Sequence, residues 1–442
     1  MRGYALALFA LLACGMVAAG EKRYVMDVNP SEANAVAARN GLRVIRSLPN
    51  RHILVAAPDY IAESSVLRRL KADASVRSAE TDPDVTLAEA MESSRTTQAS
   101  LQALPSSLTV ATVTQFYGAT VRAGYVAQPA ADLIHAPQLQ AMGFTGTGVV
   151  AVIDTGVDGT HPALKGVLVG GYDFIHETAG AATDTTDVSA ATQAALAQST
   201  VAFLDSKNTP VVLNQSTVAF LDQSTVAFLD GAAPQDFGHG TMVAGLIHRV
   251  APAARIMPLK AFGADGSARM SDIVRAIHWA VEHGATVINM SFSTTSSTAE
   301  LQAAVKYAAD RKVIMVAAAG NQGKPLLVYP AGYRAVTGAG STTNLDGRSA
   351  FSNYGEASVY TSAPGEALIT TYPGNHYAAV WGTSFSAALV SGAAAVFDQA
   401  QRGALSFNGF QDALDKGVPV SLEMGDARLQ LEKSLGAILG DK

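Results

Sequence analysis

The chain has 442 residues, of which 48% are hydrophobic and 15% are charged, with 39 glycines. This composition is typical of a folded α/β protein with a large buried core, and it excludes a disordered polymer. The formal net charge of −6 provides none of the basic surface that nucleic-acid binding requires. We therefore expect no nucleic-acid partner.

The first 20 residues have the features of an export signal. Arg2 precedes an apolar run at 4–13, and small residues follow at 17–19. Because the run is too short to span a bilayer permanently, we predict that residues 1–20 are a signal peptide. The product is then secreted, either to the extracellular space or to the periplasm.

The only cysteine, Cys14, lies inside this signal. The residues before it loosely resemble a bacterial lipoprotein signal, in which Cys14 would carry a lipid anchor. Position 14 leaves a very short signal, and Leu12 fits that motif poorly, so soluble export is the preferred interpretation. Either way, the mature chain has no internal disulfide.

Residues 21–88 are expected to form a small separate domain. Strands are predicted at 22–28, 42–47, 52–57 and 76–81, with helices after Asn29 and at 62–70. Asn29 and Pro30 are a typical helix start. The order β-α-β-β-α-β predicts a ferredoxin-like α+β fold.

Two segments show no pattern of a folded domain. Residues 89–124 are rich in Ser, Thr, Ala and Gln, so we predict an exposed linker where processing could occur. An insertion at about 176–235 contains the octapeptide Gln-Ser-Thr-Val-Ala-Phe-Leu-Asp three times, at 198–205, 215–222 and 223–230. Repeats this short match no solenoid unit, and the sequence suggests no function for them.

From 125 to 442 the pattern alternates strands and helices. Strands are predicted at 148–153, 286–290 and 312–318, with helices at 271–284 and 298–310. Ser271 is the expected cap of the first of these helices. Such alternation predicts a doubly wound parallel sheet with its active site at the carboxyl ends of the strands.

Asp154 ends the first of these strands, in Val-Ile-Asp-Thr-Gly-Val-Asp at 152–158. A carboxylate fixed there could orient a histidine and stabilise its charged form. Asp-Thr-Gly also opens ordinary turns and carries the catalytic site of aspartic proteases. An aspartic protease needs two such motifs, and the chain has one.

His239 lies between two glycines, in Gly-His-Gly-Thr-Met-Val-Ala-Gly at 238–245. This setting, at the start of a small-residue helix, gives the imidazole room to meet partners on both sides. A lone histidine is otherwise most often a structural residue. His161, in Thr-His-Pro, is expected to be such a structural neighbour.

Ser384 occurs in Gly-Thr-Ser-Phe-Ser-Ala-Ala at 382–388. A serine at the amino end of a buried helix is favoured by the helix dipole, and the glycine before it lets a substrate approach. The pattern is not the Gly-x-Ser-x-Gly elbow of α/β-hydrolases. Ser386 is the local rival, and we expect it to serve helix packing.

Asn321 follows a predicted strand, in Ala-Ala-Ala-Gly-Asn-Gln-Gly at 317–323. An asparagine in a glycine turn can aim its side-chain amide at a developing oxyanion. Asparagine beside glycine is also common in plain turns. The motif is therefore informative only together with the other three.

In chain order Asp, His, Asn, Ser, these motifs together resemble the subtilase family of serine proteases. The resemblance runs from about residue 125 to the end. It includes the segments 139–148, 287–291, 329–332, 363–365 and 425–435. The position of the 21–88 unit resembles that of the inhibitory propeptide of this family.

The resemblance implies a catalytic role for each motif. Ser384 would be the nucleophile, His239 the general base and then acid, and Asp154 its orienting partner. Asn321 and the backbone amide of Ser384 would form the oxyanion hole. The implied protein is a subtilisin-like serine endopeptidase, made as a zymogen with its own propeptide as intramolecular inhibitor.

The same resemblance places the pocket for the substrate's first side chain. It would lie between Ser291-Phe292-Ser293 and the segment containing Ala318 and Gly320. Val328 would form its floor, where relatives often have glycine. We therefore predict a shallow pocket that prefers small or medium apolar residues.

Some positions depart from the family pattern. Phe385 and Ala388 replace the usual methionine and proline, and neither takes part in the triad chemistry. Only 12 residues separate His239 from Pro252, too few for the calcium loop of secreted subtilisins. We expect no required cofactor and assign no metal ligand, although weak calcium binding at other oxygen sites stays open.

A non-catalytic subtilase-like binding protein is the alternative function, and it would require the loss of one of the four catalytic residues.

Overall fold

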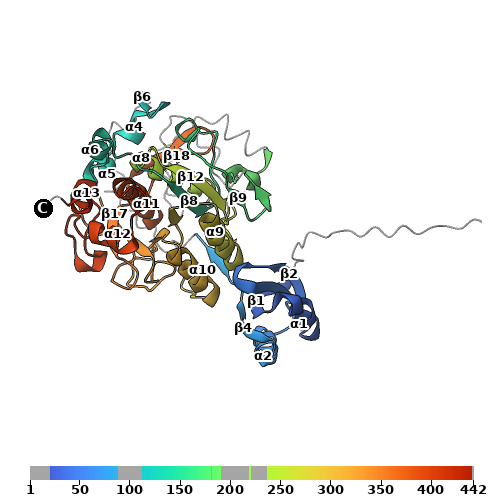
Figure 1. Ribbon diagram of the computed structural model, residues 1–442. Helices are drawn as coiled ribbons and strands as arrows, with labels where there is room; N and C mark the ends of the chain where they lie inside the picture. The colour runs from blue at the N-terminus through green and yellow to red at the C-terminus, as the bar shows by residue number, and fades with distance from the viewer. Residues whose placement is uncertain (1–19, 88–111, 181, 191–218, 221–235, 441–442) are drawn as a thin grey trace, which may run out of the picture. The chain divides into compact units, whose positions relative to one another are not determined.

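The computed structural model describes residues 20–87, 112–180, 182–190, 219–220 and 236–440. It divides into two compact units, Met1–Pro83 and Asp84–Lys442, each with its own sheet (Figure 1). The predicted signal peptide with Cys14, the first part of the predicted linker and nearly all of the repeat segment lie outside the described residues.

The smaller unit has the predicted β-α-β-β-α-β order. Its sheet is antiparallel, with strand order β2-β3-β1-β4. Asn29 acts as a cap, although the turn that it caps is the short 3-10 helix η1, and α1 begins only after it. The elements are β1 (Glu21–Val28), η1 (Pro30–Glu32), α1 (Ala33–Arg39), β2 (Arg43–Ser47), β3 (His52–Pro58), α2 (Glu63–Ala72) and β4 (Val76–Thr81).

The larger unit is built on an eight-stranded sheet with the order β10-β9-β12-β8-β14-β15-β16-β17. All neighbouring strands are parallel except β9 and β10. The strands are β8 (Val149–Asp154), β9 (Tyr172–Asp173), β10 (Thr178–Ala179), β12 (Arg255–Lys260), β14 (Val287–Met290), β15 (Ile314–Ala318), β16 (Thr337–Thr342) and β17 (Thr361–Pro364).

Helices cover both faces of this sheet (Figure 1). Alternate residues of β8 show the two faces: Val150 and Val152 pack with α8 and α11, whereas Ala151 and Ile153 pack with α9 and α10. The predicted doubly wound fold is therefore confirmed. The helices are α8 (His239–Val250), α9 (Met270–Glu282), α10 (Ala299–Asp310), α11 (Thr383–Ala400), α12 (Phe407–Leu414) and α13 (Leu431–Leu439).

The described part of the predicted linker, residues 112–124, is folded. Strands β6 (Val113–Phe116) and β7 (Ala119–Arg122) form a hairpin. Phe116 and Val121 are buried in a cluster with Tyr125 and Trp381. These few apolar residues are enough to pack the segment against the larger unit. Because most of the segment is Ser, Thr, Ala and Gln, its composition predicted an exposed linker. Three short helices follow: α4 (Ala123–Val126), α5 (Pro129–Leu133) and α6 (Ala136–Ala141).

Two smaller sheets complete this unit. Strand β5 (Asp84–Thr86) pairs antiparallel with β13 (Ser267–Arg269). Strand β11 (Ala219–Phe220), from the second repeat, pairs with β19 (His376–Val380), which also pairs with β18 (Leu368–Tyr372). None of the helices in the described part of the chain combines the length and the apolar character needed to cross a membrane.

One helix start differs from the prediction. Helix α9 begins at Met270, and Arg269, not Ser271, occupies the N-cap position. Ser271 is buried within the first turn. Because β13 runs directly into the helix, the strand sets the helix start and no capping side chain is used.

Candidate active site

Asp154 is the last residue of β8 and is fully buried. Its Oδ1 accepts hydrogen bonds from the backbone amide of Thr155 (2.8 Å) and from Nδ1 of His239 (2.8 Å). A carboxylate that accepts both bonds is fixed in one orientation. The structure thus brings together the first two residues of the predicted triad.

His239 is the first residue of α8, and a close approach between α8 and the end of β8 sets its position. A side chain on the next residue, Gly240, would place its Cβ 2.1 Å from the carbonyl oxygen of Gly156 and 3.1 Å from Cβ of Asp154. Only glycine permits this approach. Because the carboxylate of Asp154 can only accept, Nδ1 of His239 carries the proton, and Nε2 is left as the acceptor.

The local charges favour the protonated form of His239. Burial, the largest single influence, lowers the pKa of its imidazole, but the charge of Asp154, the hydrogen bond to it and the neighbouring carboxylates together raise the pKa above its ordinary value. The nearby carboxylates of Asp236 and Asp184 act in the same direction. A buried imidazolium at this position is therefore stabilised.

Ser384 is the second residue of α11, behind Gly382, whose φ of 153° lies in a region that only glycine readily adopts. The Ser384 hydroxyl donates to the carbonyl oxygen of Ser291 (3.0 Å), and the Ser291 hydroxyl donates back to the carbonyl oxygen of Ser384 (2.8 Å). The ring of the following residue, Phe385, lies 5.5 Å from that of His239. The start of α11, which carries Ser384, thus lies beside the ring of His239.

Ser386, the local rival of Ser384, and His161, the expected structural neighbour, both have structural contacts. The Ser386 hydroxyl donates to the carbonyl oxygens of Ala363 (3.0 Å) and Pro364 (3.2 Å). His161 is fully buried, and its Nε2 lies 3.0 Å from the carbonyl oxygen of His376. Burial lowers the pKa of His161 to about 4, so this histidine is neutral at pH 7.

Asn321 follows β15 and faces the start of α11. Its Oδ1 accepts hydrogen bonds from the backbone amide and the hydroxyl of Thr383, both at 2.9 Å. These two donors fix the amide orientation, so Nδ2 is the atom turned toward Gly382: a Cβ on that glycine would lie 3.7 Å from it. A donor placed beside the residues preceding Ser384 could stabilise an oxyanion formed there.

The predicted pocket segments follow neighbouring parallel strands. Ser291-Phe292-Ser293 comes directly after β14, and Ala318 ends β15, two residues before Gly320. Val328 is buried in the same apolar cluster as Phe292. The next residue, Tyr329, exchanges backbone hydrogen bonds with Thr294. The chain thus returns beside the segment that follows Ser293.

Sequence reasoning missed four polar residues around the catalytic pair: Thr155, Asp184, Asp236 and Thr241. The two threonines belong to the Asp-Thr-Gly and His-Gly-Thr motifs, which was a usable signal. Burial raises the pKa of Asp184 to about 7 and that of Asp236 to about 6. Asp184 had no signal, because it lies in the inserted segment, 29 residues from Thr155 and 57 from Thr241.

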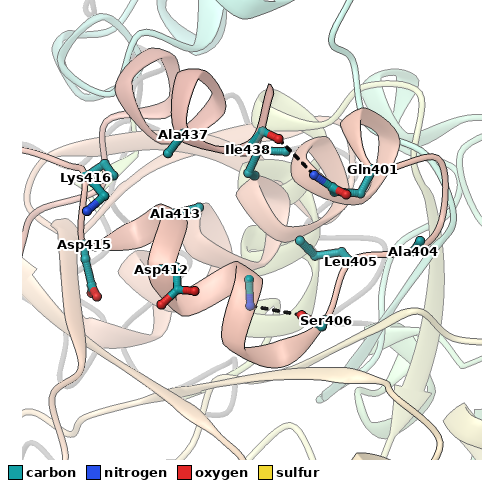
Figure 2. A pocket seen from close by; sticks show the side chains of 11 residues that line it. Gln401, Ala404, Leu405, Ser406, Asp412, Ala413, Asp415, Lys416, Ala437 and Ile438 are labelled. Carbon is teal, nitrogen blue, oxygen red and sulfur yellow. Dashed lines mark hydrogen bonds between the residues drawn. The ribbon is translucent and has the colours of Figure 1, made fainter. Parts of the chain in front are cut away.

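A separate pocket between α11, α12 and α13 contains none of these residues (Figure 2). A hydrogen bond from Nε2 of Gln401 to the carbonyl oxygen of Ile438 closes one side of it. Its wall has no pairing of a nucleophile with a base. Within the described ranges, moreover, no group of three or more His, Cys, Asp or Glu side chains could hold a metal ion.

Comparison with known proteins decides the family. Residues 146–414, well over half of the chain, match the model of the subtilase family. This chain belongs to the subtilase family. The matched range contains Asp154, His239, Asn321 and Ser384.

Individual subtilases show the extent of the similarity. A thermophilic serine proteinase of Bacillus sp. (strain AK1) is 34% identical over 247 residues, 56% of this chain and 51% of that protein. Subtilisin BL of Lederbergia lenta is 40% identical over 171 residues, 37% of this chain and 63% of that protein. Thermitase of Thermoactinomyces vulgaris is 30% identical over 281 residues, 61% of this chain and 82% of that protein. The chain thus spans about half to two thirds of the first two of these relatives.

Proposed function

We propose that this subtilase is a serine endopeptidase that hydrolyses peptide bonds through an acyl-enzyme on Ser384. The observation that carries the proposal is the buried 2.8 Å hydrogen bond between Asp154 and Nδ1 of His239, together with the contact of that imidazole with Phe385, the residue after Ser384. All four residues that the chemistry needs are retained. Nothing in the site favours the alternative of a non-catalytic binding protein.

The reaction begins with proton transfer from Ser384. Its hydroxyl leaves the carbonyl of Ser291 and donates to Nε2 of His239, which takes the proton as Ser384 attacks the substrate carbonyl. Asp154 holds the imidazole in the tautomer that accepts at Nε2, and its charge stabilises the imidazolium. His239 then returns the proton to the leaving amine.

The negative charge of the tetrahedral intermediate is met by two donors. One is Nδ2 of Asn321, whose orientation Thr383 fixes. The other is the backbone amide of Ser384 at the start of α11, where the helix dipole favours an anion. Both donors are in place before the reaction, so little reorganisation is needed when the charge develops.

A fluorophosphonate probe tests this function. The purified mature chain should be labelled at Ser384, as mapped by mass spectrometry, and should cleave casein. Ser384→Ala and His239→Ala should each lose activity by several orders of magnitude, because triad members act as a unit. Activity in Ser384→Ala, or a label on Ser386, would overturn the assignment.

The zymogen is a second part of the proposal: the 21–88 unit would inhibit the peptidase and aid its folding. Residues 84–87, the tail of the predicted 21–88 unit but part of the larger compact unit, support it. Asp84–Thr86 lies as an antiparallel strand on β13, Leu87 donates its amide to the carbonyl of Gly266 (2.7 Å), and Val85 is buried with Phe292. A Cβ on Gly266 would meet Asp236, three residues before His239. The tail thus pairs with backbone that lies close to Asp236, three residues before His239.

Self-processing is expected between this tail and the hairpin formed by β6 and β7, within the first part of the predicted 89–124 linker. Ser384→Ala, expressed with no other protease present, should therefore accumulate uncut. The wild type should lose residues 21–88, which intact-mass measurement would show. Equal processing of both proteins would contradict self-cleavage.

Export is the third part of the proposal. N-terminal sequencing and mass measurement of the exported protein distinguish its two forms. A soluble product without lipid supports cleavage of the 1–20 signal. A lipid-modified Cys14 in the membrane fraction supports the alternative anchor.

A further inference from the structure

One short turn of the insertion reaches the catalytic pair. The 3-10 helix η5 (Asp184–Asp187) carries two carboxylates, and that of Asp184 is fully buried. Its Oδ1 accepts a hydrogen bond from the hydroxyl of Thr155. Its Oδ2 accepts from both the hydroxyl and the backbone amide of Thr241, the latter at 3.2 Å. One carboxylate therefore joins the residue after Asp154 to the helix that begins at His239.

The hydroxyls of Thr155 and Thr241 both donate to Asp184, and both also accept a backbone amide. The Thr155 oxygen accepts from the backbone amide of Gly240 (3.0 Å), and the Thr241 oxygen accepts from the backbone amide of Asp158 (2.7 Å). Each hydroxyl thus takes an amide from the opposite element and donates its proton to Asp184. The end of β8 and the start of α8 are linked in both directions, with Asp184 as the common acceptor.

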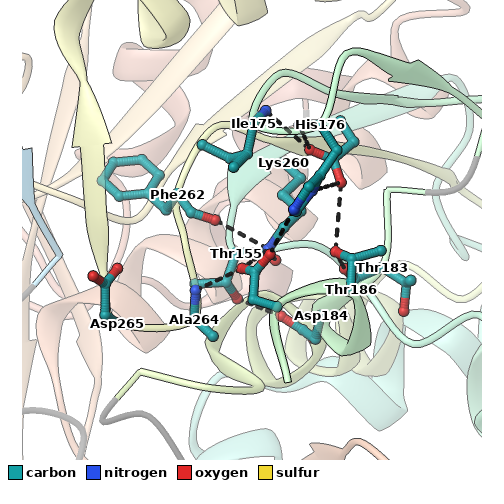
Figure 3. A network of polar contacts seen from close by, with 12 residues as sticks. Thr155, Ile175, His176, Thr183, Asp184, Thr186, Lys260, Phe262, Ala264 and Asp265 are labelled. Atoms are coloured by element: carbon teal, nitrogen blue, oxygen red, sulfur yellow. Dashed lines mark hydrogen bonds and ion pairs between the residues drawn. The ribbon is translucent and has the colours of Figure 1, made fainter. Parts of the chain in front are cut away.

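The rest of the turn is anchored to the sheet (Figure 3). Asp187 forms an ion pair with the buried Lys260 (2.7 Å), which also donates to the carbonyl oxygen of Thr155 (2.5 Å). His176 contacts Asp187 (3.4 Å) on its other side. The turn that carries Asp184 is therefore held on two sides, by Lys260 and His176.

We propose that Asp184 is a positioning residue for catalysis, holding the end of β8 and the start of α8 at the separation that the Asp154–His239 hydrogen bond needs. This inference rests on the proposed peptidase function and deepens it. It also gives the start of the insertion a role. Asp184 does not touch the reacting atoms, so its effect is exerted through Asp154 and His239.

The charged surroundings define what should change when the carboxylate is lost. Asp154, Asp236 and Asp184 face His239 from three segments, and each raises its pKa. Lys260 and Asp154 act on Asp184 itself, and Tyr372 lies near enough to be affected by it. Replacing Asp184 by a neutral residue removes one of the three carboxylates that stabilise the imidazolium.

Asp184→Asn tests the proposal. We expect kcat to fall about 10- to 100-fold with little change in KM, because misplaced groups slow the chemical step more than binding. The acid limb of the kcat/KM profile should move to lower pH, because the pKa of His239 falls. The matched control is Asp398→Asn, at a little-exposed aspartate of α11 that accepts from the amide of Leu405. It should keep the wild-type kcat and pH profile.

Thr155→Val and Thr155→Ser supply a second test if Asp184→Asn does not fold. Valine removes both the donor to Asp184 and the acceptor for the Gly240 amide, and serine retains both, so serine should recover most of the activity that valine loses. A lower melting temperature with unchanged kcat and an unchanged acid limb, in Asp184→Asn or in Thr155→Val, would show a merely structural role and overturn the proposal. Fluorophosphonate labelling of the wild type separates this failure from failure of the peptidase function itself.

Discussion

The side chain of Asn321 has a divided role at the scale of a single residue. Its oxygen accepts two hydrogen bonds from Thr383, and its nitrogen is the donor that we propose for the oxyanion hole. The two functions can be separated by substitution, because Asn321→Asp keeps the oxygen and removes the donor.

Asn321→Ala should lower kcat by about 10²–10³ with a similar KM, the cost found on removing the oxyanion-hole asparagine of subtilisin itself. Asn321→Asp should be at least as slow, because it places a negative charge beside the oxyanion. Steady-state kinetics with a peptide anilide would measure both. A kcat within threefold of wild type for Asn321→Ala would remove Asn321 from the oxyanion hole.

Val328 is the residue with which pocket depth can be tested. Val328→Gly should shift the preferred first residue of the substrate from Ala or Leu toward Phe or Tyr. One or two methylenes of misfit are worth only about 1–3 kcal/mol, so the change is a bias and not a switch. Val336→Ala, in the same apolar cluster, is the control and should keep the wild-type profile. A peptide library profiles all three, and a wild type that already prefers Phe would contradict the assignment of Val328 as floor.

At the scale of elements, the closest approach in the site is that of α8 to the end of β8 at Gly240. Gly240→Ala would force a Cβ into the carbonyl of Gly156, so the helix start must move. We expect kcat to fall about 10²-fold, because displacement of His239 by about 1 Å is enough for that loss. Gly170→Ala is the control, since a Cβ there meets nothing within 4 Å. Equal kcat values for the two variants would show that the approach is not required.

The sequence predicted those elements whose signals are local. Helix α10 covers Ala299–Asp310 where a helix was predicted at 298–310, and the apolar run before Asp154 is a buried parallel strand. The triad motifs were readable because glycine and small residues mark each close approach. Asp184 could not be predicted, because its contacts join distant segments and its own neighbours carry no motif. The hairpin formed by β6 and β7 was missed for a related reason: Phe116 is buried only because Tyr125 and Trp381 lie beside it.

At the scale of the whole molecule, buried histidines and buried carboxylates oppose each other in acid. Burial lowers the pKa of His248 to about 4, below about 6.5 in the unfolded chain. The unfolded state therefore binds more protons between these values, and His248 destabilises the fold as pH falls from about 6.5 to about 4. Asp184 and Asp236, whose pKa values are raised to about 7 and about 6, have the opposite effect. The pH dependence of the wild-type free energy of unfolding is therefore the sum of the histidine and carboxylate contributions.

His248→Gln isolates one of these contributions. The stability of the variant relative to wild type should rise as pH falls from 6.5 to 4, by up to about 3 kcal/mol at 1.36 kcal/mol per pKa unit. Urea unfolding at several pH values, in the Ser384→Ala background to prevent autolysis, would measure it. A difference that stays constant from pH 8 to pH 4 would show that His248 does not titrate as inferred.

The strand order of the main sheet also determines when, during synthesis of the chain, the active-site residues can come together. Helix α11, which carries Ser384, packs against β14, β15, β16 and β17, and Asp154 belongs to β8 at the middle of that sheet. A ribosome must therefore deliver nearly the whole chain before nucleophile and base can meet. In the proposed mechanism, the growing polypeptide until then holds a histidine and an aspartate but no nucleophile. We therefore expect peptidase activity to begin only after the segment that carries Ser384 has been made and packed against the sheet.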